Sequence, residues 1–490
     1  MNKVIIIGSG IGGIASSIRL AKNGYSVKVF ESNSFCGGKL HAFEKSGYRF
    51  DAGPSLFTMP NYVDELFELC GENPKDHFLY IKKNIACNYF WEDGVRLTAY
   101  GDKKKFIDEV EKKLGVPKQK LINYFNRSKN KYDLTAPLFL EKSLHKLETY
   151  FSKDTIKAIF SIGKYDIFKS LHELNEELLE EDHLIQLFDR FATYNGSNPY
   201  KTSGMMSLIN HLEQHFGTFL PKLGMVDITN SLVGLAKRQG VEFILNTKVD
   251  EIVVEDKKTK GVKCKSNFYD SDIVISNMDI NPTYNMLMPN QRKPKKILSS
   301  EPSSSAVIFY WGISKKFEEL DLHNIFFSKD YFKEFDFIFN KGKISKDPTI
   351  YINITSKDIA TDAPKNSENW FVMINAPHDK GQDWSKLVDQ LREDIKIKIS
   401  HNLGIDISKY IEIEEVLTPK TIQFKTQSHC GSLYGPSSNN RLSAFFRHPN
   451  FSKKIKNLFF CGGSVHPGGG IPLCLLSAKI TTDILKKQDD

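Results

Sequence analysis

The sequence predicts an α/β fold, and three of its stretches carry that prediction. Residues 3–31 are typical of a β-α-β unit, residues 224–255 place a helix before two strands, and residues 457–485 combine a short strand, a glycine-rich loop and a helix. Strands that alternate with helices in this way form parallel sheets. With 490 residues, 40% of them hydrophobic and 26% charged, the chain can bury a large core around such a sheet.

The first unit begins with Val4–Ile7, a continuous apolar run of the kind found in strands that are buried on both faces of a sheet. Gly24 stands where the following helix should end. Val27–Phe30 is the second expected strand, and Glu31 follows it directly. Between the two strands, apolar residues recur at helical spacing: Ile14, Ala15, Ile18 and Ala21.

Two insertions separate the α/β segments. From about residue 60 to 200 the pattern is mostly helical with charged faces, as around Phe106–Leu121 and Leu171–Phe191. Residues 285–425 are typical of an α+β unit. The other expected elements are strands at Val241–Leu245, Val249–Val254, Asp272–Ser276, Ala306–Trp311, Thr349–Ile354 and Leu458–Phe460, a turn at Asp256–Gly261 before a strand that begins at Val262, and helices at Leu387–Ser400 and Leu473–Leu485.

The loop after the first strand is Gly8-Ser9-Gly10-Ile11-Gly12-Gly13. Gly8 permits the tight turn, Gly10 lets the backbone approach a pyrophosphate, and Gly13 lets the helix pack closely on the strand. The free amides at the helix N-terminus can bind the anion, and Glu31 can accept hydrogen bonds from an adenosine ribose. The pattern predicts a dinucleotide site for FAD or NAD, and the acid disfavours a 2′-phosphate.

The residues that follow Glu31 narrow this choice. The segments Gly37-Gly38-Lys39 and Tyr48–Ser55 resemble those of the flavin amine oxidase and phytoene desaturase superfamily. In that superfamily the double glycine and its basic residue lie along the FAD phosphates and ribityl chain, and the turn that contains Gly53-Pro54 lies beside the isoalloxazine ring. NAD dehydrogenases lack this continuation, so the resemblance implies FAD.

The C-terminal segment Asn457–Pro472 is similar to the signature of bacterial carotenoid desaturases. There a strand, a glycine loop and a closing helix complete the FAD site, and amides near Gly470–Leu473 can bind a second polar part of the cofactor. The resemblance covers essentially the whole chain. It extends through Tyr194–Tyr200 and Asp272–Asn277. On the segments Gly431–Gly435, Ala444–Asn450 and Pro472–Leu476 it is strongest toward the 1-hydroxycarotenoid 3,4-desaturases.

The resemblance implies a Rossmann-type FAD-binding domain built from residues 1–60, 205–282 and 426–490. Residues 61–204 and 283–425 would form an inserted α+β substrate domain with a helical, membrane-proximal region. The residues expected to bind FAD are Gly8, Gly10, Ile11, Gly12, Gly13, Glu31, Ser32, Gly38, Lys39, Leu40, Gly53, Pro54, Ser55, Val249, Asn277, Gly463, Ser464, Gly470, Ile471 and Pro472.

The expected reaction is the introduction of a C=C bond into a lipophilic carotenoid by hydride transfer to the flavin. A long apolar tunnel would hold the substrate, and the 35 Phe and 19 Tyr residues could line it as well as fill the core. His466 is a candidate for proton handling, although a structural role in its loop is favoured. The alternatives are a phytoene desaturase, a carotenoid isomerase or ketolase, a flavin amine oxidase, and a non-catalytic flavin- or lipid-binding protein.

The amino-acid composition indicates which binding partners and which cellular compartment to expect. The net charge of +8 is spread over short basic runs, which favours a solvated surface or anionic lipid over nucleic acid. Seven cysteines without paired spacing are typical of a reducing cytoplasm. The sequence shows neither a targeting segment nor an apolar run long enough to span a membrane. We therefore expect a cytoplasmic protein that associates peripherally with the inner face of the cell membrane.

Three further sequence features bear on membrane contact, metal binding and hydrolase activity. The aromatic segments Asn324–Phe327 and Tyr331–Phe339 fit either an interfacial patch or the core of the substrate domain. His211 and His215 share a helical face, but their H-x-E-x-H order has no third ligand motif nearby, so no metal is expected. A serine hydrolase is disfavoured because the sequence contains no G-x-S-x-G.

Overall fold

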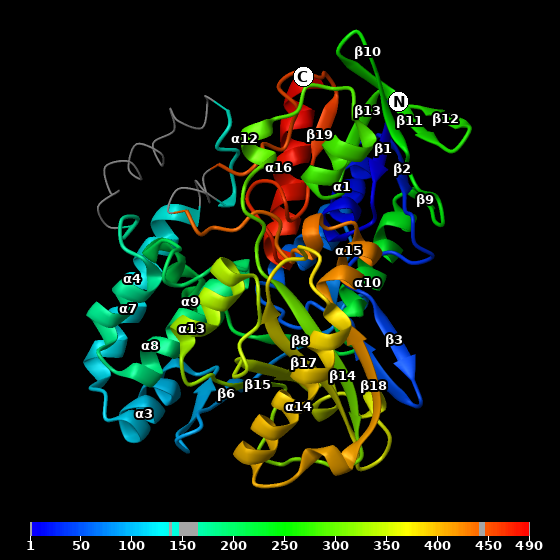
Figure 1. Ribbon diagram of the computed structural model, residues 1–490. Coiled ribbons are helices and arrows are strands. Elements are labelled where there is room, and N and C mark those ends of the chain that lie inside the picture. Colours follow the sequence, from blue (N-terminus) through cyan, green and yellow to red (C-terminus); the bar gives the residue numbers. More distant parts are fainter. Residues whose placement is uncertain (1, 137–139, 147–164, 441–445, 490) are drawn as a thin grey trace.

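The computed structural model describes residues 2–136, 140–146, 165–440 and 446–489. Ala444 and Phe445, used above for the resemblance, and residues 147–164 of the expected helical region lie outside the described residues. Figure 1 shows the parallel sheet together with both chain ends, a second sheet beyond it, and a group of helices to one side. Within the described ranges, no helix is both long and apolar enough to cross a bilayer.

The parallel sheet has five strands in the order β19-β13-β1-β2-β9, all parallel to their neighbours. They are β1 (Lys3–Ile7), β2 (Ser26–Phe30), β9 (Glu242–Ile244), β13 (Ile273–Ser276) and β19 (Leu458–Phe460). The central strand is buried on both faces, as its apolar run predicted: Val4 and Ile6 face one core cluster and Ile5 and Ile7 the other. The sheet draws strands from all three of the segments 1–60, 205–282 and 426–490, while the domain boundaries themselves remain a prediction.

One face of this sheet is covered by helices and the other by a small antiparallel sheet. The helices are α1 (Ile11–Lys22), α2 (Asn61–Cys70), α10 (Val226–Arg238) and α16 (Ile471–Asp489), and Figure 1 shows α1 and α16 side by side. The antiparallel sheet is β10 (Glu251–Glu255), β11 (Lys258–Cys264) and β12 (Asn267–Asp270). Its first turn is shorter than expected, because Asp256 and Lys257 alone form it with positive φ and β11 begins at Lys258.

The second sheet has seven strands in the order β18-β14-β17-β16-β15-β6-β7. They are β6 (Ile85–Phe90), β7 (Arg96–Tyr100), β14 (Ser305–Ile313), β15 (His323–Phe326), β16 (Ile350–Asn353), β17 (Glu368–Ala376) and β18 (Ile411–Leu417). Alternate residues of β14 face opposite sides: Phe309 packs with helix α14 (Trp384–Leu403), and Ile308 with the hairpin β3 (Ala42–Lys45)–β4 (Tyr48–Asp51). This second face is turned toward the first sheet, and a further pair, β5 (Tyr80–Lys82) and β8 (Phe219–Pro221), lies nearby.

The expectation of a mostly helical region from 60 to 200 is partly wrong, because residues 80–100 form three strands. β6 pairs with β15, more than two hundred residues later in the chain, and a local pattern does not report so distant a partner. The helices that are present are also shorter than expected. Gly115 ends α3 (Lys103–Leu114) before α4 (Lys118–Thr135), and Glu180 in a left-handed conformation separates α7 (Leu171–Leu179) from α8 (Asp182–Asp189).

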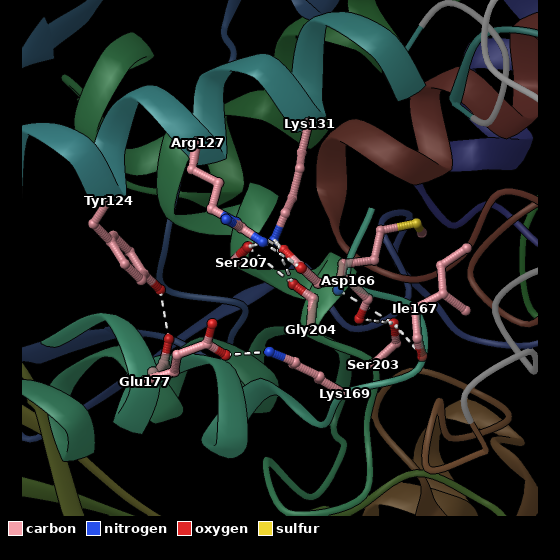
Figure 2. A network of polar contacts seen from close by, with 12 residues as sticks. Tyr124, Arg127, Lys131, Asp166, Ile167, Lys169, Glu177, Ser203, Gly204 and Ser207 are labelled. Atoms are coloured by element: carbon pink, nitrogen blue, oxygen red, sulfur yellow. Dashed lines mark hydrogen bonds and ion pairs between the residues drawn. The ribbon is translucent and has the colours of Figure 1, made fainter. Parts of the chain in front are cut away.

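A buried ion-pair network ties this helical group together (Figure 2). Lys131 on α4 is 1% exposed, and its Nζ lies 2.5 Å from Asp166 Oδ2. The same ammonium donates to the Gly204 carbonyl at 3.1 Å and to Ser207 Oγ at 2.8 Å. Arg127, one turn earlier, donates through Nε and Nη2 to the two Asp166 oxygens. Three segments of the chain are therefore joined at one buried charge cluster.

The aromatic segments at 324–339 are core rather than surface. Phe326 and Phe327 are buried at 0% and 1% exposure, and Tyr331 and Phe335 on α13 (Tyr331–Asp336) pack into the same helical core. Phe332 is the exception, with 60% of its surface exposed. The core interpretation therefore holds for most residues of these segments, while Phe332 and Lys333 are exposed and Phe337 is half-buried.

Candidate functional site

A cavity of about 640 Å³ lies between the parallel sheet and the seven-stranded sheet. Its wall begins at the glycine loop after β1 and ends at side chains of β14 and β17, such as Ile308 and Phe371. Of the twenty residues that the sequence predicts to bind a cofactor, all but Gly13 line this cavity. Residues as distant in the chain as Ser32, Val249 and Pro472 thus meet at one surface.

Asn277, directly after β13, packs against both glycine loops of the site. Its Nδ2 donates to the Cys461 carbonyl at 3.2 Å. A Cβ placed on Gly10 or Gly12 would lie 2.8 Å from the Asn277 amide, and one on Gly462 would lie 2.5 Å from it. The missing side chains at these glycines therefore make room for Asn277 as well as for a ligand, a second function that the sequence pattern did not indicate.

Gly13 acts where the sequence predicts, at the contact between helix and strand. A Cβ at this position would lie 2.2 Å from the Gly8 carbonyl oxygen, closer than any real contact allows. Because Gly13 has no side chain, α1 starts directly at the end of β1. Among the described residues no side chain caps the helix, so its first amides face the cavity and suit an anion such as a pyrophosphate.

Glu31 is 5% exposed and holds the neighbouring loops in place. Its Oε2 accepts hydrogen bonds from the Ser9 amide at 2.9 Å and the Ser9 hydroxyl at 2.8 Å. Its Oε1 accepts from Ser32 Oγ at 3.2 Å and from the amide and Nδ2 of Asn33 at 2.9 Å each. The carboxylate lines the cavity at the tip of β2, the position at which the sequence predicts hydrogen bonds to an adenosine ribose.

Lys39 follows the double glycine and lines the cavity. Its ammonium donates to the backbone carbonyls of Ser432 at 3.1 Å and Leu433 at 2.8 Å, which joins the N-terminal and C-terminal segments across the site. Burial lowers the pKa of Lys39 to about 8, against a weaker opposing effect of Asp279. The contacts with carbonyls add a structural role to the predicted one along the phosphates.

The turn at Gly53-Pro54 is fixed from both sides. Asp51 accepts hydrogen bonds from the amides of Met225 at 2.8 Å and Val226 at 3.0 Å, at the start of α10. On the other side, the Tyr310 hydroxyl donates to the Ala52 carbonyl at 2.8 Å. These contacts hold Gly53, Pro54 and Ser55 as part of the cavity wall.

The C-terminal glycine loop completes the wall beside the start of α1, where a Cβ on Gly12 would lie 3.1 Å from the Gly462 backbone. Arg447, 5% exposed, donates to the Gly463 carbonyl at 3.0 Å and to the carbonyls of Tyr434 and Pro436. Ser464 Oγ accepts from the Ile280 amide at 2.9 Å and so links this loop to the end of β13. Gly470 and the first turn of α16 also line the cavity, and a Cβ on Gly470 would meet nothing within 4 Å.

His466 does not line the cavity within the described part of the chain. Its Nε2 lies 2.9 Å from the Lys142 carbonyl, and burial lowers its pKa to about 4. A neutral ring that donates to a carbonyl is a loop-fixing group, which agrees with the favoured structural interpretation. His211 and His215 likewise stack ring on ring, with centroids 4.5 Å apart.

The rest of the cavity is mostly aliphatic. Ile, Leu and Met side chains supply most of this wall, and Phe30 and Phe371 are the two phenylalanines that the described residues contribute to it. The phenylalanine surplus therefore packs mainly into the cores, and the aromatic part of the cavity wall consists, among the described residues, of these two together with Tyr194, Tyr331, Tyr351 and Tyr434. Arg190, Glu213 and His323 are among the charged or ionisable residues on the cavity wall that sequence reasoning missed. Single polar residues within apolar segments produce no spacing signal that could have revealed them.

Together, two glycine loops, a helix N-terminus and a buried acid beside an enclosed apolar chamber define a flavoprotein oxidoreductase. The model of the family "Flavin containing amine oxidoreductase" matches residues 11–485, and the chain belongs to this family. It is a FAD-dependent oxidoreductase.

Two relatives and two solved structures are similar to the chain over nearly its whole length. The chain is 52% identical over 485 residues to a 1-hydroxycarotenoid 3,4-desaturase of Flavobacterium sp. (strain P99-3), covering 99% of both chains. It is 32% identical to a 4,4′-diapolycopene oxygenase of Methylomonas sp., covering 98% of this chain and 97% of the relative. An oxidoreductase of Methanosarcina mazei superposes with a TM-score of 0.66 at 14% identity (99% and 100% covered), and a putrescine oxidase bound to putrescine with 0.64 at 12% (99% of each). These two structures share the fold.

Proposed function

We propose that the protein is a FAD-dependent desaturase that introduces the 3,4 double bond into hydroxylated acyclic carotenoids. The observation that carries the proposal is the 52% identity, across 99% of both chains, to a 1-hydroxycarotenoid 3,4-desaturase. The shape of the site supports it, because one continuous cavity leads from the glycine loops into an aliphatic chamber that suits a polyene.

The chain's own residues would bind, orient and shield the substrate. The reaction removes a hydride from one carbon and a proton from its neighbour, which leaves a C=C bond. Bound FAD supplies the hydride acceptor for this two-electron oxidation. The aliphatic wall around Ile308 and Leu208 holds the polyene and excludes water. Since a polyene delocalises a developing positive charge, positioning contributes more here than a strong base.

The test is a comparison of substrates on the purified, FAD-loaded protein. We expect a hydroxylated acyclic carotenoid to lose two hydrogens and to absorb at longer wavelength, while phytoene is left unchanged. Consumption of phytoene would assign the protein to the other desaturase subgroup. A product that gains oxygen would instead favour the activity named for the 32% identical relative, and turnover of an amine would contradict the proposal.

We also propose that the protein takes its substrate from the cytoplasmic face of a membrane, to which it binds peripherally. Two exposed rings on the helical group support this proposal: Phe168 and Phe332 have 75% and 60% of their surfaces exposed. Phe332 packs on Tyr200, with ring centroids 5.0 Å apart, and the Gly204 amide donates to the carbonyl of Lys169, next to Phe168. The positive net charge favours anionic lipid.

Vesicle sedimentation tests this second proposal. The protein should sediment with anionic vesicles more than with zwitterionic ones, and Phe168→Ser with Phe332→Ser should weaken that binding about tenfold or more. Phe424→Ser is the matched control, because Phe424 is 82% exposed and its helix α15 (Pro419–Thr426) lies apart from α7 and α13 in Figure 1. Equal losses in the control, or no sedimentation of the unchanged protein, would contradict the membrane proposal.

A further inference from the structure

One part of the aliphatic chamber carries a cluster of polar side chains, here called the polar end of the cavity: Tyr89, Arg190, Glu213 and His323, which are buried, and Ser55, Tyr194 and Tyr351, which are half-buried. All but Tyr89 line the cavity. The strand register brings part of the cluster together, because Ile325 of β15 pairs with Tyr89 of β6 and with Tyr351 of β16. Arg190 and Glu213 approach from the helical group, at 7% and 3% exposure.

Arg190 and Glu213 form the first half of the polar end. Arg190 donates from Nη1 to the Tyr194 hydroxyl at 2.9 Å and from Nη2 to the Tyr89 hydroxyl at 2.8 Å. The Tyr194 hydroxyl donates in turn to Glu213 Oε2, and Glu213 Oε1 lies 3.6 Å from Arg190 Nη2. Within the described residues, two atoms of this group have no hydrogen-bond partner, Arg190 Nε and Glu213 Oε1.

His323 forms the second half. Asn353 Nδ2 donates to the Leu322 carbonyl at 3.0 Å, which fixes the orientation of that amide, and lies 3.2 Å from His323 Nδ1. The Tyr351 hydroxyl lies 2.7 Å from the same Nδ1, which is therefore the acceptor. Burial lowers the pKa of His323 to about 3, with a smaller effect of Lys83 in the same direction, so the ring is neutral and its proton is on Nε2. That Nε2–H has no partner in the described part of the chain.

Hydrogen-bonding groups without partners are unexpected in a cavity wall that binds only hydrocarbon. A buried donor or acceptor without a partner costs free energy, and a hydrocarbon packed against it keeps that cost in place. A hydroxyl group can meet both kinds, since it donates one hydrogen bond and accepts others. The polar end offers an anionic acceptor at Glu213 Oε1 and donors at His323 Nε2 and Arg190 Nε.

We infer that the polar end of the cavity binds the hydroxyl group of the polyene, which donates to Glu213 and accepts from His323. This inference rests on the proposed function and adds to it the residues that select the hydroxylated substrate. Ser55 Oγ lies 2.8 Å from the Tyr351 hydroxyl, so the polar end adjoins the Gly53-Pro54 turn. A hydroxyl on C1 is two bonds from C3, and its anchoring would place the 3,4 bond beside this turn. Glu213 and His323 are thus positioning residues that set which bond reacts.

The test compares two polyenes that differ only in the hydroxyl group, each with wild type, Glu213→Gln and His323→Leu. For wild type we expect kcat/KM for the hydroxylated polyene to exceed that for the other on the order of 100-fold, because a site built for a hydroxyl rejects its absence. Each variant should lower this ratio by about tenfold or more through the hydroxylated substrate alone. Binding of each polyene, followed by its absorption shift, should change in parallel.

Glu334→Gln is the matched control. Glu334 is 1% exposed, accepts hydrogen bonds from Ser328 Oγ and Thr349 Oγ1, each at 2.7 Å, and does not line the cavity within the described residues. It should leave the substrate ratio unchanged. FAD occupancy and the melting temperature of every variant verify folding, and Glu213→Gln suffices if His323→Leu does not fold.

The outcomes separate the two levels of the proposal. Equal losses on both polyenes would show that Glu213 and His323 are structural and would overturn the inference. Equal turnover of both polyenes by wild type would also overturn it, while the desaturase function stands. Turnover of neither polyene by FAD-loaded wild type would remove the proposed function and the inference with it.

Discussion

Asn277 shows how one side chain can organise a site from three distant parts of the chain. It occupies the space left open by Gly10, Gly12 and Gly462, and it donates to the Cys461 carbonyl. A bulky residue at Gly10 would therefore meet Asn277 before it met a ligand. Gly10→Val should therefore lose cofactor binding for two reasons, a displaced Asn277 and an obstructed pyrophosphate.

At Gly13, we expect substitution to act on folding. The Cβ of Gly13→Ala would lie 2.2 Å from the Gly8 backbone oxygen, which cannot move without shifting the end of β1. The free energy of unfolding should fall by about 3 kcal/mol or more, as in strongly overpacked sites. Urea unfolding measures this change.

The control for Gly13 is the same substitution at Gly234, inside α10, where a Cβ would meet only Arg238 Nη1 at 3.4 Å. Gly234→Ala should be neutral or stabilise the protein by up to about 1 kcal/mol, because alanine favours a helix. Equal effects of the two substitutions would contradict the contact described here.

For His466, the structure predicts that substitution leaves the rate of the chemical step nearly unchanged. Gln at this position can still donate to the Lys142 carbonyl but cannot exchange a proton near neutral pH. His466→Gln should keep the rate constant of flavin reduction by substrate within about threefold of wild type, against the 100-fold or larger loss expected for a general acid or base. Single-turnover flavin reduction measures it, and a loss of the larger size at full FAD occupancy would restore His466 as a catalytic candidate.

Among the secondary-structure elements, those whose signals lie within a few consecutive residues were predictable from the sequence, and those that depend on distant partners were not. The parallel strands, α1 and α16 were predicted because their signals, continuous apolar runs and glycine turns, lie within a few residues. β6 was missed because its partner β15 is far away in the sequence. All predicted cofactor residues but Gly13 were placed on one wall because motifs encode their own backbone geometry. Arg190 and Glu213 were missed because their meaning depends on packing between elements.

The ion-pair network of Figure 2 gives a prediction at this scale. Asp166→Asn leaves Lys131 as a buried charge without its counterion, which should cost about 3–5 kcal/mol of unfolding free energy. The double variant with Lys131→Met should cost less than the sum of the two single variants, since the buried charge is then removed and Arg127, whose side chain is 42% exposed, can be hydrated. Asp133→Asn in the exposed Lys129–Asp133 pair is the control and should change stability by about 0.5 kcal/mol or less. Strict additivity in the double-mutant cycle would refute the buried network.

At the scale of the whole molecule, buried histidines should make the fold sensitive to acid. Burial lowers the pKa of each of five such histidines to about 3 or 4: His211, His323, His378, His448 and His466. An unfolded histidine has a pKa near about 6.5, so between these values the unfolded chain binds protons that the folded chain excludes. This contribution to stability is complete above about pH 6.5 and is lost as the pH falls toward about 4.

His183 acts in the opposite direction, because its hydrogen bond to Glu181 raises its pKa to about 9. Its contribution is complete below about pH 6.5 and is lost as the pH rises through about 9. The five buried histidines outnumber it, so urea midpoints should fall steadily from about pH 6.5 to about pH 4.5. His466→Gln should reduce the slope by at most one proton, or about 1.4 kcal/mol per pH unit. A flat profile would falsify the assignment of neutral buried rings.

The strand order β19-β13-β1-β2-β9 determines when the parallel sheet can be completed during protein synthesis. During synthesis the ribosome releases β1 first, but the neighbour of β13 at the edge, β19, begins only at Leu458. The contacts of this sheet are among the most non-local in the chain, and such contacts form slowly. Until β19 and α16 emerge, the β13 edge and one flank of α1 have no cover, and newly made chains are open to misassembly. The wall of the cavity is therefore complete only after the first turns of α16 have been synthesised.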